Sequence, residues 1–186
     1  KRRVAAFGLP VPEGRVMSLA DIEALPERLD APVALKILDD DIPHKTEAGG
    51  VALGLRDRAE VAAAALRIRD NVARHAPHAA ARHFLMEPMQ APPLAELIVG
   101  VKRDALFGMI LVVGAGGILV ELLKDSASLL LPVGPEEVRA ALTSLKCFPL
   151  LSGFRGRPAA DLDAVVAAIM AIARFAEANR DTLVDL

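Results

Sequence analysis

The sequence predicts a mixed α/β fold, because two hydrophobic periods alternate along a chain of globular composition. Hydrophobic types make up 53% of the 186 residues and charged types 25%, a balance typical of globular proteins rather than of disordered chains. Short apolar runs, typical of strands, alternate with longer segments that have amphipathic helical spacing. The length suits one ordinary domain or two small lobes that share a core.

The helices of the first half begin at clear capping signals. Ser18 is a suitable N-cap for a helix over residues 19–29, and Asp21 is placed to reach back to that cap. Asp57 is expected to cap an alanine-rich amphipathic helix in the same way. The other expected elements of this half are strands over residues 32–38, 50–55 and 82–89, a polar loop over residues 39–49, and the helix behind Asp57 over residues 59–75.

The second half contains the most apolar expected strand. Residues 109–113 form a continuous apolar run that is typical of a central strand, and glycines follow it at once. Pro135 is well placed as the first residue of a helix that runs to residue 146. The other expected elements are strands over residues 96–102, 118–123 and 128–131, a turn over residues 152–156, a helix over residues 161–178, and the start of a final strand over residues 182–186.

Charge and cysteine content exclude several classes of protein. A formal net charge of −2 provides no electrostatic argument for a nucleic acid or a membrane as partner, and we expect neither. The single cysteine, Cys147, excludes an internal disulfide framework and a multi-cysteine metal cluster, and a reducing, cytoplasmic compartment is expected. The chain begins at Lys1 in what reads as the middle of a helix, so we expect it to be excised from a longer polypeptide.

Lys36 lies inside an otherwise apolar predicted strand. Burying an ammonium group is costly unless an anion meets it. A phosphate contact from a strand that faces a ligand site is one interpretation, and a solvated edge of the strand is the other.

His44 and Lys45 lie in a polar loop that closes on Gly49 and Gly50. Paired glycines let a backbone approach a ligand and can present amide groups to phosphate oxygens. A histidine in such a loop could accept a phosphoryl group or move a proton, although a lone loop histidine is more often a solvated side chain. The remaining histidines are interpreted as surface residues and not as metal ligands: His75, His78 and His83.

Two acidic positions on neighbouring predicted strands could contact a nucleotide. Glu87 is followed by Pro88 and Met89, and Glu96 lies at the next strand. Ion pairing with nearby arginines is the competing interpretation of both carboxylates. The glycine-rich run over residues 114–117 resembles a phosphate loop, but it lacks the Lys-Ser/Thr ending of a P-loop and the helix start of a dinucleotide site.

Taken in order, these stretches resemble the ATP-grasp domain of the NDP-forming acyl-CoA synthetases, which is related to the succinyl-CoA synthetase β subunit. The similarity covers essentially the whole chain, and its ordered combination is specific although each piece is short. The pieces are GLPVP (8–12), PVALK (32–36), HKTEAGGV (44–51), EPM (87–89), ELIVGVKRD (96–104), FG (107–108), GAGGI (114–118), ELLKD (121–125) and GFRG (153–156).

The resemblance implies an ATP-grasp fold whose two small α+β lobes, about residues 1–86 and 87–186, enclose a nucleotide cleft. The family converts acyl-CoA, ADP and phosphate into acid, CoA and ATP through phosphohistidines, and uses ATP/ADP with Mg²⁺. By position, His44 would carry the phosphoryl group and Glu96 would face the ribose. The resemblance also assigns two groups of nucleotide contacts: Lys36, Lys45, Gly49 and Gly50 at the phosphates, and Glu87, Pro88 and Met89 at the adenine.

One departure from the family pattern bears on activity. The family's Asp-x-Asn-Pro segment, which supplies magnesium ligands, would follow Leu186, so those ligands are expected beyond the residues given. CoA-binding and ligase domains are expected on the same polypeptide or on a partner subunit. The isolated chain is therefore not expected to make acyl-CoA.

Two other functions remain open on the sequence. The chain could be a degenerate ATP-grasp module that regulates a fused acetyltransferase, or it could belong to a carboxylate–amine ligase that works through an acyl phosphate. His44 favours the synthetase over both, because neither alternative needs a histidine in this loop.

Overall fold

The computed structural model describes residues 1–42, 44–117 and 124–186 and divides into two compact units. Unit 1 comprises residues 1–11 and 92–186, and unit 2 comprises residues 12–91. The chain therefore passes from one unit to the other twice. Each unit has its own hydrophobic core and its own antiparallel sheet.

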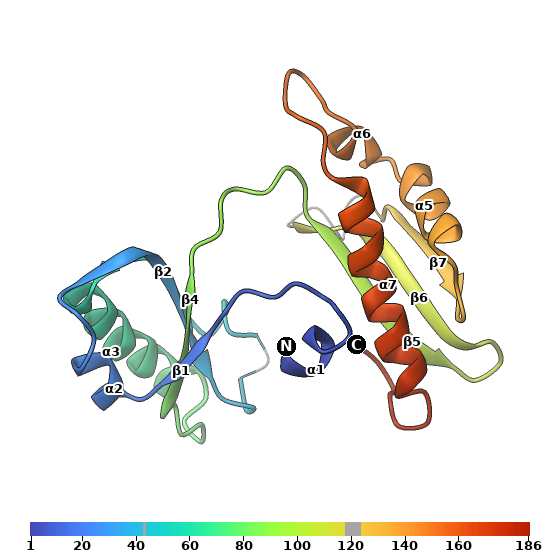
Figure 1. Cartoon of the computed structure of the whole chain (residues 1–186). Coiled ribbons are helices and arrows are strands. Elements are labelled where there is room, and N and C mark those ends of the chain that lie inside the picture. Colours follow the sequence, from blue (N-terminus) through green and yellow to red (C-terminus); the bar gives the residue numbers. More distant parts are fainter. Residues whose placement is uncertain (43, 118–123) are drawn as a thin grey trace. The chain divides into compact units, whose positions relative to one another are not determined.

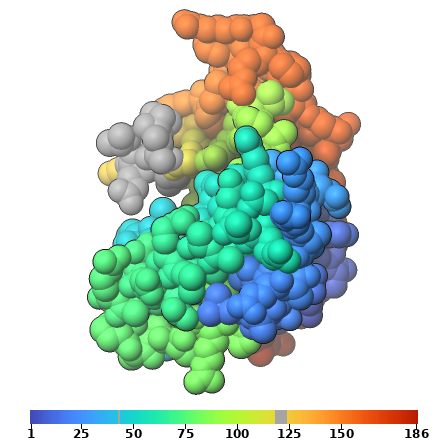
Figure 2. Space-filling view, turned by 90° about the vertical axis from the view of Figure 1, so that its left-hand side faces the viewer, coloured from blue at the N-terminus to red at the C-terminus, as the bar shows by residue number. Residues whose placement is uncertain are grey.

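Unit 2 is a four-stranded antiparallel sheet in the order β1-β4-β2-β3, with two helices on one of its faces (Figure 1). Its elements are β1 (Arg15–Met17), α2 (Leu19–Glu23), β2 (Arg28–Leu38), β3 (Val51–Asp57), α3 (Arg58–His75) and β4 (His83–Pro88). Figure 2 faces the helical side of this unit, where the blue atoms of α2 lie beside the teal and green atoms of α3.

The two expected caps of unit 2 are confirmed. Ser18 Oγ accepts the amide of Asp21, whose carboxylate accepts the amide of Ser18, and Asp57 Oδ1 accepts the amide of Glu60 at 2.8 Å. Helix α2 ends at Glu23, well before residue 29. The reason is Pro26, because a proline disfavours helical geometry in the residue before it and cannot donate an amide bond.

Alternation along β2 separates the two faces of this sheet. Val33, Leu35 and Ile37 are buried against the helices together with Phe84 of β4, and they form the core of the unit. The residues between them, including Lys36, point to the face that no helix of unit 2 covers.

Unit 1 contains a three-stranded antiparallel sheet in the order β5-β6-β7, packed against helices on one face. Its elements are α1 (Arg2–Ala5), β5 (Leu97–Asp104), β6 (Gly108–Ala115), β7 (Ser126–Leu130), α5 (Pro135–Ser144), α6 (Phe148–Leu151) and α7 (Leu162–Ala178). The apolar run expected as a central strand is β6, which confirms that prediction. Pro135 starts α5, as expected. Helix α7 begins at Leu162, one residue after the expected start, because Asp161 is its N-cap and accepts the amide of Ala164.

The ends of the chain both pack within unit 1. The ring of Phe7 meets that of Phe175 edge-on at 5.5 Å between centroids, which ties the first residues to α7. Near the other end, the backbone of Asp185 forms an isolated antiparallel β-bridge with Lys102 of β5. Leu186 exchanges two backbone hydrogen bonds with Val101. The start of a final strand is thus present.

The division of the chain differs from the expected lobes of residues 1–86 and 87–186. Strand β4 runs on to Pro88, and the amide of Met89 donates to Pro32 O at 2.8 Å, so unit 2 extends to residue 91.

Two further elements, β1 and α6, were not predicted from the sequence. The strand expected over residues 118–123 lies outside the described residues. Within the described part of the chain, no helix has the length and apolarity needed to span a membrane.

Asp125 joins β7 to the start of α6 in unit 1. Its buried carboxylate accepts the amides of Lys146 and Cys147, each at 2.8 Å. These two hydrogen bonds hold the pKa of Asp125 below its ordinary value of 3.8, and the bond from the Lys146 amide contributes most. Burial, together with this neighbouring carboxylate, raises the pKa of the Cys147 thiol, so the sulfur stays protonated at neutral pH.

We expect Asp125→Asn to lower the melting temperature by several degrees at pH 7, because an amide cannot accept both backbone N–H groups. A folded-state pKa below the unfolded one stabilises the fold above the unfolded value, 3.8, and this stabilisation is lost as pH falls through the folded-state pKa. The gap between wild type and variant should therefore narrow in thermal melts below pH 4. Asp181→Asn, at an exposed position of the same unit, is the control. A gap that is constant with pH would contradict the assignment.

Candidate functional site

Lys36 lies in the middle of the unit 2 sheet and not at an edge. Strand β2 has β4 on one side and β3 on the other, and Lys36 is opposite Leu85 and Val51 in the two registers. Its side chain is 36% exposed on the uncovered face. The interpretation of Lys36 as a residue on a solvated strand edge is therefore wrong.

The Lys36 ammonium meets a carboxylate on the neighbouring strand. Lys36 Nζ donates to Glu87 Oε2 at 2.9 Å, and Glu87 is only 3% exposed. The register places Glu87 opposite Ala34, so Lys36 and Glu87 form a diagonal pair on one face. Because the Glu87 carboxylate is screened from water, its electrostatic attraction to the Lys36 ammonium is stronger than that of an exposed ion pair. Glu87 is thus ion-paired with Lys36 across the sheet.

A glycine of the preceding segment permits the burial of Glu87. A Cβ added at Gly14 would lie 2.8 Å from Leu85 Cδ1 and 3.3 Å from Glu87 Oε1. Any larger residue would push this segment away from β4. The sequence alone predicted no role for Gly14, because its close neighbours, Leu85 and Glu87, lie about seventy residues further along the chain.

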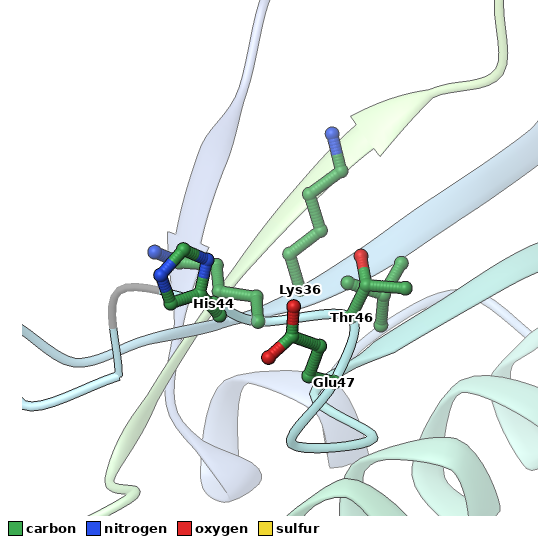
Figure 3. A pocket seen from close by; sticks show the side chains of 6 residues that line it. Lys36, His44, Thr46 and Glu47 are labelled. Atoms are coloured by element: carbon green, nitrogen blue, oxygen red, sulfur yellow. The ribbon is translucent and has the colours of Figure 1, made fainter. Parts of the chain in front are cut away.

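A hollow of about 520 Å³ opens beside Lys36 on unit 2 (Figure 3). It collects two ammonium groups, an imidazole, a carboxylate and a hydroxyl within one small surface region. The residues that line it are Lys36, His44, Lys45, Thr46, Glu47 and Val51. Figure 3 shows Lys36 rising from β2 while His44, Thr46 and Glu47 project from the loop beside it. The sequence thus identified three of its residues, and Thr46 and Glu47 were missed although they stand in the same motif.

The loop that carries His44 is anchored on both sides by buried apolar residues. Ile42 is 2% exposed and Ala48 3% exposed, and both belong to the core of unit 2. Between them, His44 is exposed, and its carbonyl accepts the amide of Ala48 at 3.2 Å. Lys45 Nζ lies 3.4 Å from Ile42 O. The loop therefore presents an accessible imidazole from a well-anchored backbone.

The paired glycines of this loop serve packing. A Cβ at Gly50 would lie 2.6 Å from Ile37 Cγ2 and 2.9 Å from Lys45 O, and one at Gly49, where φ is +63°, would lie 2.6 Å from Asn71 Nδ2. Their amides donate inside the loop, from Gly49 to Thr46 O and from Gly50 to Lys45 O. Neither amide is therefore available to a phosphate oxygen in this conformation.

Pro88 borders a second hollow of about 300 Å³ on unit 2, at the end of β4. It is lined by Glu13, Gly14, Arg15, Val33, Met86, Glu87 and Pro88. Met89 follows it with a side chain that is 39% exposed. Exposed apolar atoms beside two backbone strands suit a flat apolar ring, whereas the Glu87 carboxylate is already bonded to Lys36.

Glu96 belongs to unit 1, where it directly precedes β5 and is exposed. Its carbonyl accepts the amide of Gly116 at 2.7 Å. A Cβ at Gly117 would lie 2.7 Å from Glu96 Oε2, and one at Gly116 would lie 2.9 Å from the carbonyl carbon of Leu97. These glycines allow the run over residues 114–117 to pass close to Glu96, so their packing role is the same as in the His44 loop.

The uncovered face of the unit 1 sheet carries a group of apolar side chains beside polar ones. Ile98 is 47% exposed and Leu130 is 55% exposed, and Ile110 and Val112 lie on the same face between them by register. Glu96 stands at the end of this face. No group of three or more His, Cys, Asp or Glu side chains within the described residues could hold a metal ion by itself.

Comparisons with known proteins identify this architecture. The model of the ATP-grasp domain family matches residues 1–181. The chain is 33% identical over 188 residues to the beta subunit of an ADP-forming acetate–CoA ligase II of Pyrococcus furiosus, covering 100% of this chain and 79% of that subunit. It is 32% identical to the ADP-forming acetate–CoA ligase I of Archaeoglobus fulgidus, of which it covers 26% and which covers 94% of this chain.

Solved structures agree with the sequence matches. The dinucleotide-forming acetyl-coenzyme A synthetase 1 of Ca. Korarchaeum cryptofilum, in complex with coenzyme A and Ca-AMPCP, superposes with a TM-score of 0.86 at 30% identity. That match covers 98% of this chain and 79% of the other. Another structure of that synthetase contains Mg-AMPPCP, and its phosphohistidine segment points towards the nucleotide binding site. It matches this chain with a TM-score of 0.78 at 28% identity, over 98% of this chain and 78% of the other. The chain thus spans about four fifths of the relatives made as subunits and about a quarter of a single-chain relative.

The ion pair of unit 2 predicts an asymmetric response to mutation. Lys36→Met should lower the free energy of unfolding by about 1–3 kcal/mol, because it removes the ammonium from a buried carboxylate. Adding Glu87→Gln to Lys36→Met should recover part of the loss, since no charge is then buried. Urea unfolding of the single and double variants measures this coupling.

Lys102→Met is the matched control, since Lys102 is an exposed lysine on the uncovered face of the other sheet. It should change the stability by less than about 0.5 kcal/mol. A Lys36→Met protein as stable as wild type would contradict the structural role of the pair.

Proposed function

The chain belongs to the ATP-grasp domain family, in the branch of the ADP-forming acid–CoA ligases, and we propose that it is the nucleotide-binding, phosphoryl-transfer domain of an NDP-forming acyl-CoA synthetase. The reaction converts acyl-CoA, ADP and phosphate into free acid, CoA and ATP. The observation that carries the proposal is the exposed imidazole of His44 in one hollow with the ammonium groups of Lys36 and Lys45.

Charge neutralisation is the first task of this hollow. A nucleotide brings several negative charges, and phosphoryl transfer depends on placement and electrostatic stabilisation more than on covalent help from other side chains. Lys36 and Lys45 supply compact positive charges from two directions, β2 and the loop. Glu87 keeps the Lys36 side chain extended along the sheet, and the remaining ammonium protons of Lys36 can still reach a phosphate oxygen.

His44 is the group that takes up the phosphoryl unit. In the direction of ATP use, a ring nitrogen of His44 donates its lone pair to the γ-phosphorus. The bond between that phosphorus and the bridging oxygen breaks, and ADP leaves with the electron pair. In the direction of ATP synthesis, the same steps run in reverse from phosphohistidine and ADP.

The nucleoside part is assigned to two apolar regions, each described within its own unit. In unit 2 the hollow at Pro88 and Met89 offers apolar atoms for the adenine. In unit 1 the uncovered sheet face offers Ile98 and Leu130, with Glu96 as an acceptor for ribose hydroxyls at its end.

Mg²⁺ is the expected metal. When bound, it neutralises phosphate charge and orients the transferring group. Because Mg²⁺ usually takes only one or two carboxylates besides the phosphates, Glu47 in the hollow suits the role of one ligand. Further ligands are assigned to the segment that would follow residue 186.

The acyl group and CoA are assigned to other parts of the enzyme. CoA-binding and ligase domains, on the same polypeptide or on a partner subunit, would supply the acyl chemistry and receive the phosphoryl group from His44. We place the enzyme in the cytoplasm. The single cysteine of this chain cannot form an internal disulfide, so the chain needs no oxidising compartment.

Phosphorylation of His44 tests the proposal. Incubation of the complete enzyme with ATP and Mg²⁺ should produce an acid-labile phosphate on the peptide that contains residue 44, detected by mass spectrometry. His44→Ala and His44→Gln should both abolish it, because neither side chain has a nucleophilic nitrogen. Nucleotide affinity measured by calorimetry should stay within a few-fold, since the imidazole acts on the transferred group.

His78→Ala, which removes another exposed histidine of unit 2, is the control and should leave the label intact. A wild-type enzyme that binds ATP but never labels residue 44 would sink the proposal and favour a regulatory module.

A further inference from the structure

We propose that Asn71 of α3 is a positioning residue for phosphoryl transfer, acting through the backbone of the loop that carries His44. The inference rests on the proposed function, because it concerns how the His44 imidazole is held for attack. Asn71 is not part of any motif that the sequence singled out, and it does not line the hollow that contains His44. It touches the loop from the opposite side.

The contact runs from a helix side chain to a loop carbonyl. Asn71 Nδ2 donates to Gly49 O at 3.2 Å. The approach is so close that a Cβ at Gly49 would lie only 2.6 Å from the same nitrogen. Gly49 has a φ of +63°, so both its conformation and its contact with Asn71 require a glycine. The loop and the helix are therefore matched to each other at this point.

A second residue of α3 orients the Asn71 amide. Arg74 Nη2 donates to Asn71 Oδ1 at 2.6 Å. An amide has one acceptor end and one donor end, so this bond turns the NH₂ group toward Gly49 O. Asn71 is half-buried between Ile68 and Val72, which face the core, and α3 carries it on a rigid element.

The place of the contact explains what it does for His44. The loop returns to the sheet through Gly50, whose carbonyl accepts the amide of Ile37 at 2.8 Å. Ile42 and Ala48 fix the loop by apolar burial, which resists withdrawal but has no direction. The bond from Asn71 adds direction at the residue after Ala48, and it thereby orients the backbone that leads back from Ala48 to His44.

Small errors in that path are costly for the reaction. In-line transfer requires the attacking nitrogen close to the phosphorus and aligned with the leaving oxygen, and a misplacement of about 1 Å can cost roughly 100-fold in rate. Nucleotide affinity depends on Lys36, Lys45 and the apolar contacts, which the Asn71 bond does not touch. Loss of the bond should therefore reduce the transfer rate and leave nucleotide affinity nearly unchanged.

The experiment uses single-turnover phosphorylation of the complete enzyme at saturating ATP and Mg²⁺, followed by rapid quench and quantification of phosphate at residue 44. Asn71→Ala should slow the transfer about 10- to 100-fold. Asn71→Asp keeps the size but replaces the donor by a carboxylate facing Gly49 O, so it should be at least as slow. Arg74→Ala should have a smaller effect, because it only frees the Asn71 amide to rotate.

Ala63→Gly is the matched control, at an exposed position of the same helix without contact to the loop. It should lower the melting temperature through the weaker helix propensity of glycine and leave the transfer rate unchanged. Amide hydrogen exchange gives a readout that does not depend on chemistry: exchange at Gly50 should rise in Asn71→Ala and stay unchanged in Ala63→Gly.

The outcomes separate the two proposals. Slower labelling in both Asn71 variants, with unchanged nucleotide affinity and a normal rate in Ala63→Gly, supports the positioning role. A wild-type labelling rate in Asn71→Ala overturns the positioning role and leaves the function of His44 standing. Equal slowing in Asn71→Ala and Ala63→Gly also overturns it, since general stability then explains the effect. An unlabelled wild-type enzyme overturns both.

Discussion

The ion pair between Lys36 and Glu87 is the interaction on which the arrangement of unit 2 depends. An ammonium in the middle of a central strand is tolerated because a buried carboxylate lies 2.9 Å away on β4. That contact exists in only one register of β2 against β4, and a slip by one residue would move Lys36 into the core. The pair therefore ties the charge of the site to the packing of Leu35 and Ile37 on the other face.

Covering only one face of each sheet is what makes a site possible. In unit 2 the helices bury the apolar side of β2, and the other side keeps Lys36 and the His44 loop accessible. In unit 1 the same one-sided cover leaves Ile98 and Leu130 exposed at the end where Glu96 stands. Within each unit the apolar core lies on the covered face, and in unit 2 the Lys36–Glu87 pair adds a second stabilising contact on the open face.

The glycines of both units show how packing and ligand binding can produce the same sequence pattern. Gly50 lies against Ile37 and the carbonyl of Lys45, and Gly116 lies against the backbone of Glu96 and Leu97, each at a distance that excludes a Cβ. A run of glycines beside a strand resembles a phosphate loop because both need close backbone approach. In this protein the close partner is another part of the same unit, and the positive charges beside the His44 loop are lysine side chains.

The sequence by itself determined the local features: the caps at Ser18 and Asp57, the helix start at Pro135, the central strand over residues 109–113, and the need of Lys36 for an anion. Each depends on neighbours within a few residues, which periodicity and capping rules report directly. The tertiary structure alone decided that the anion is Glu87, 51 residues away, and that α3 supports the His44 loop from behind. It also decided the existence of β1, which pairs with β4. The reason is that strand register and helix–loop contacts depend on long-range packing, and no local pattern in the chain encodes which distant residue will be the partner.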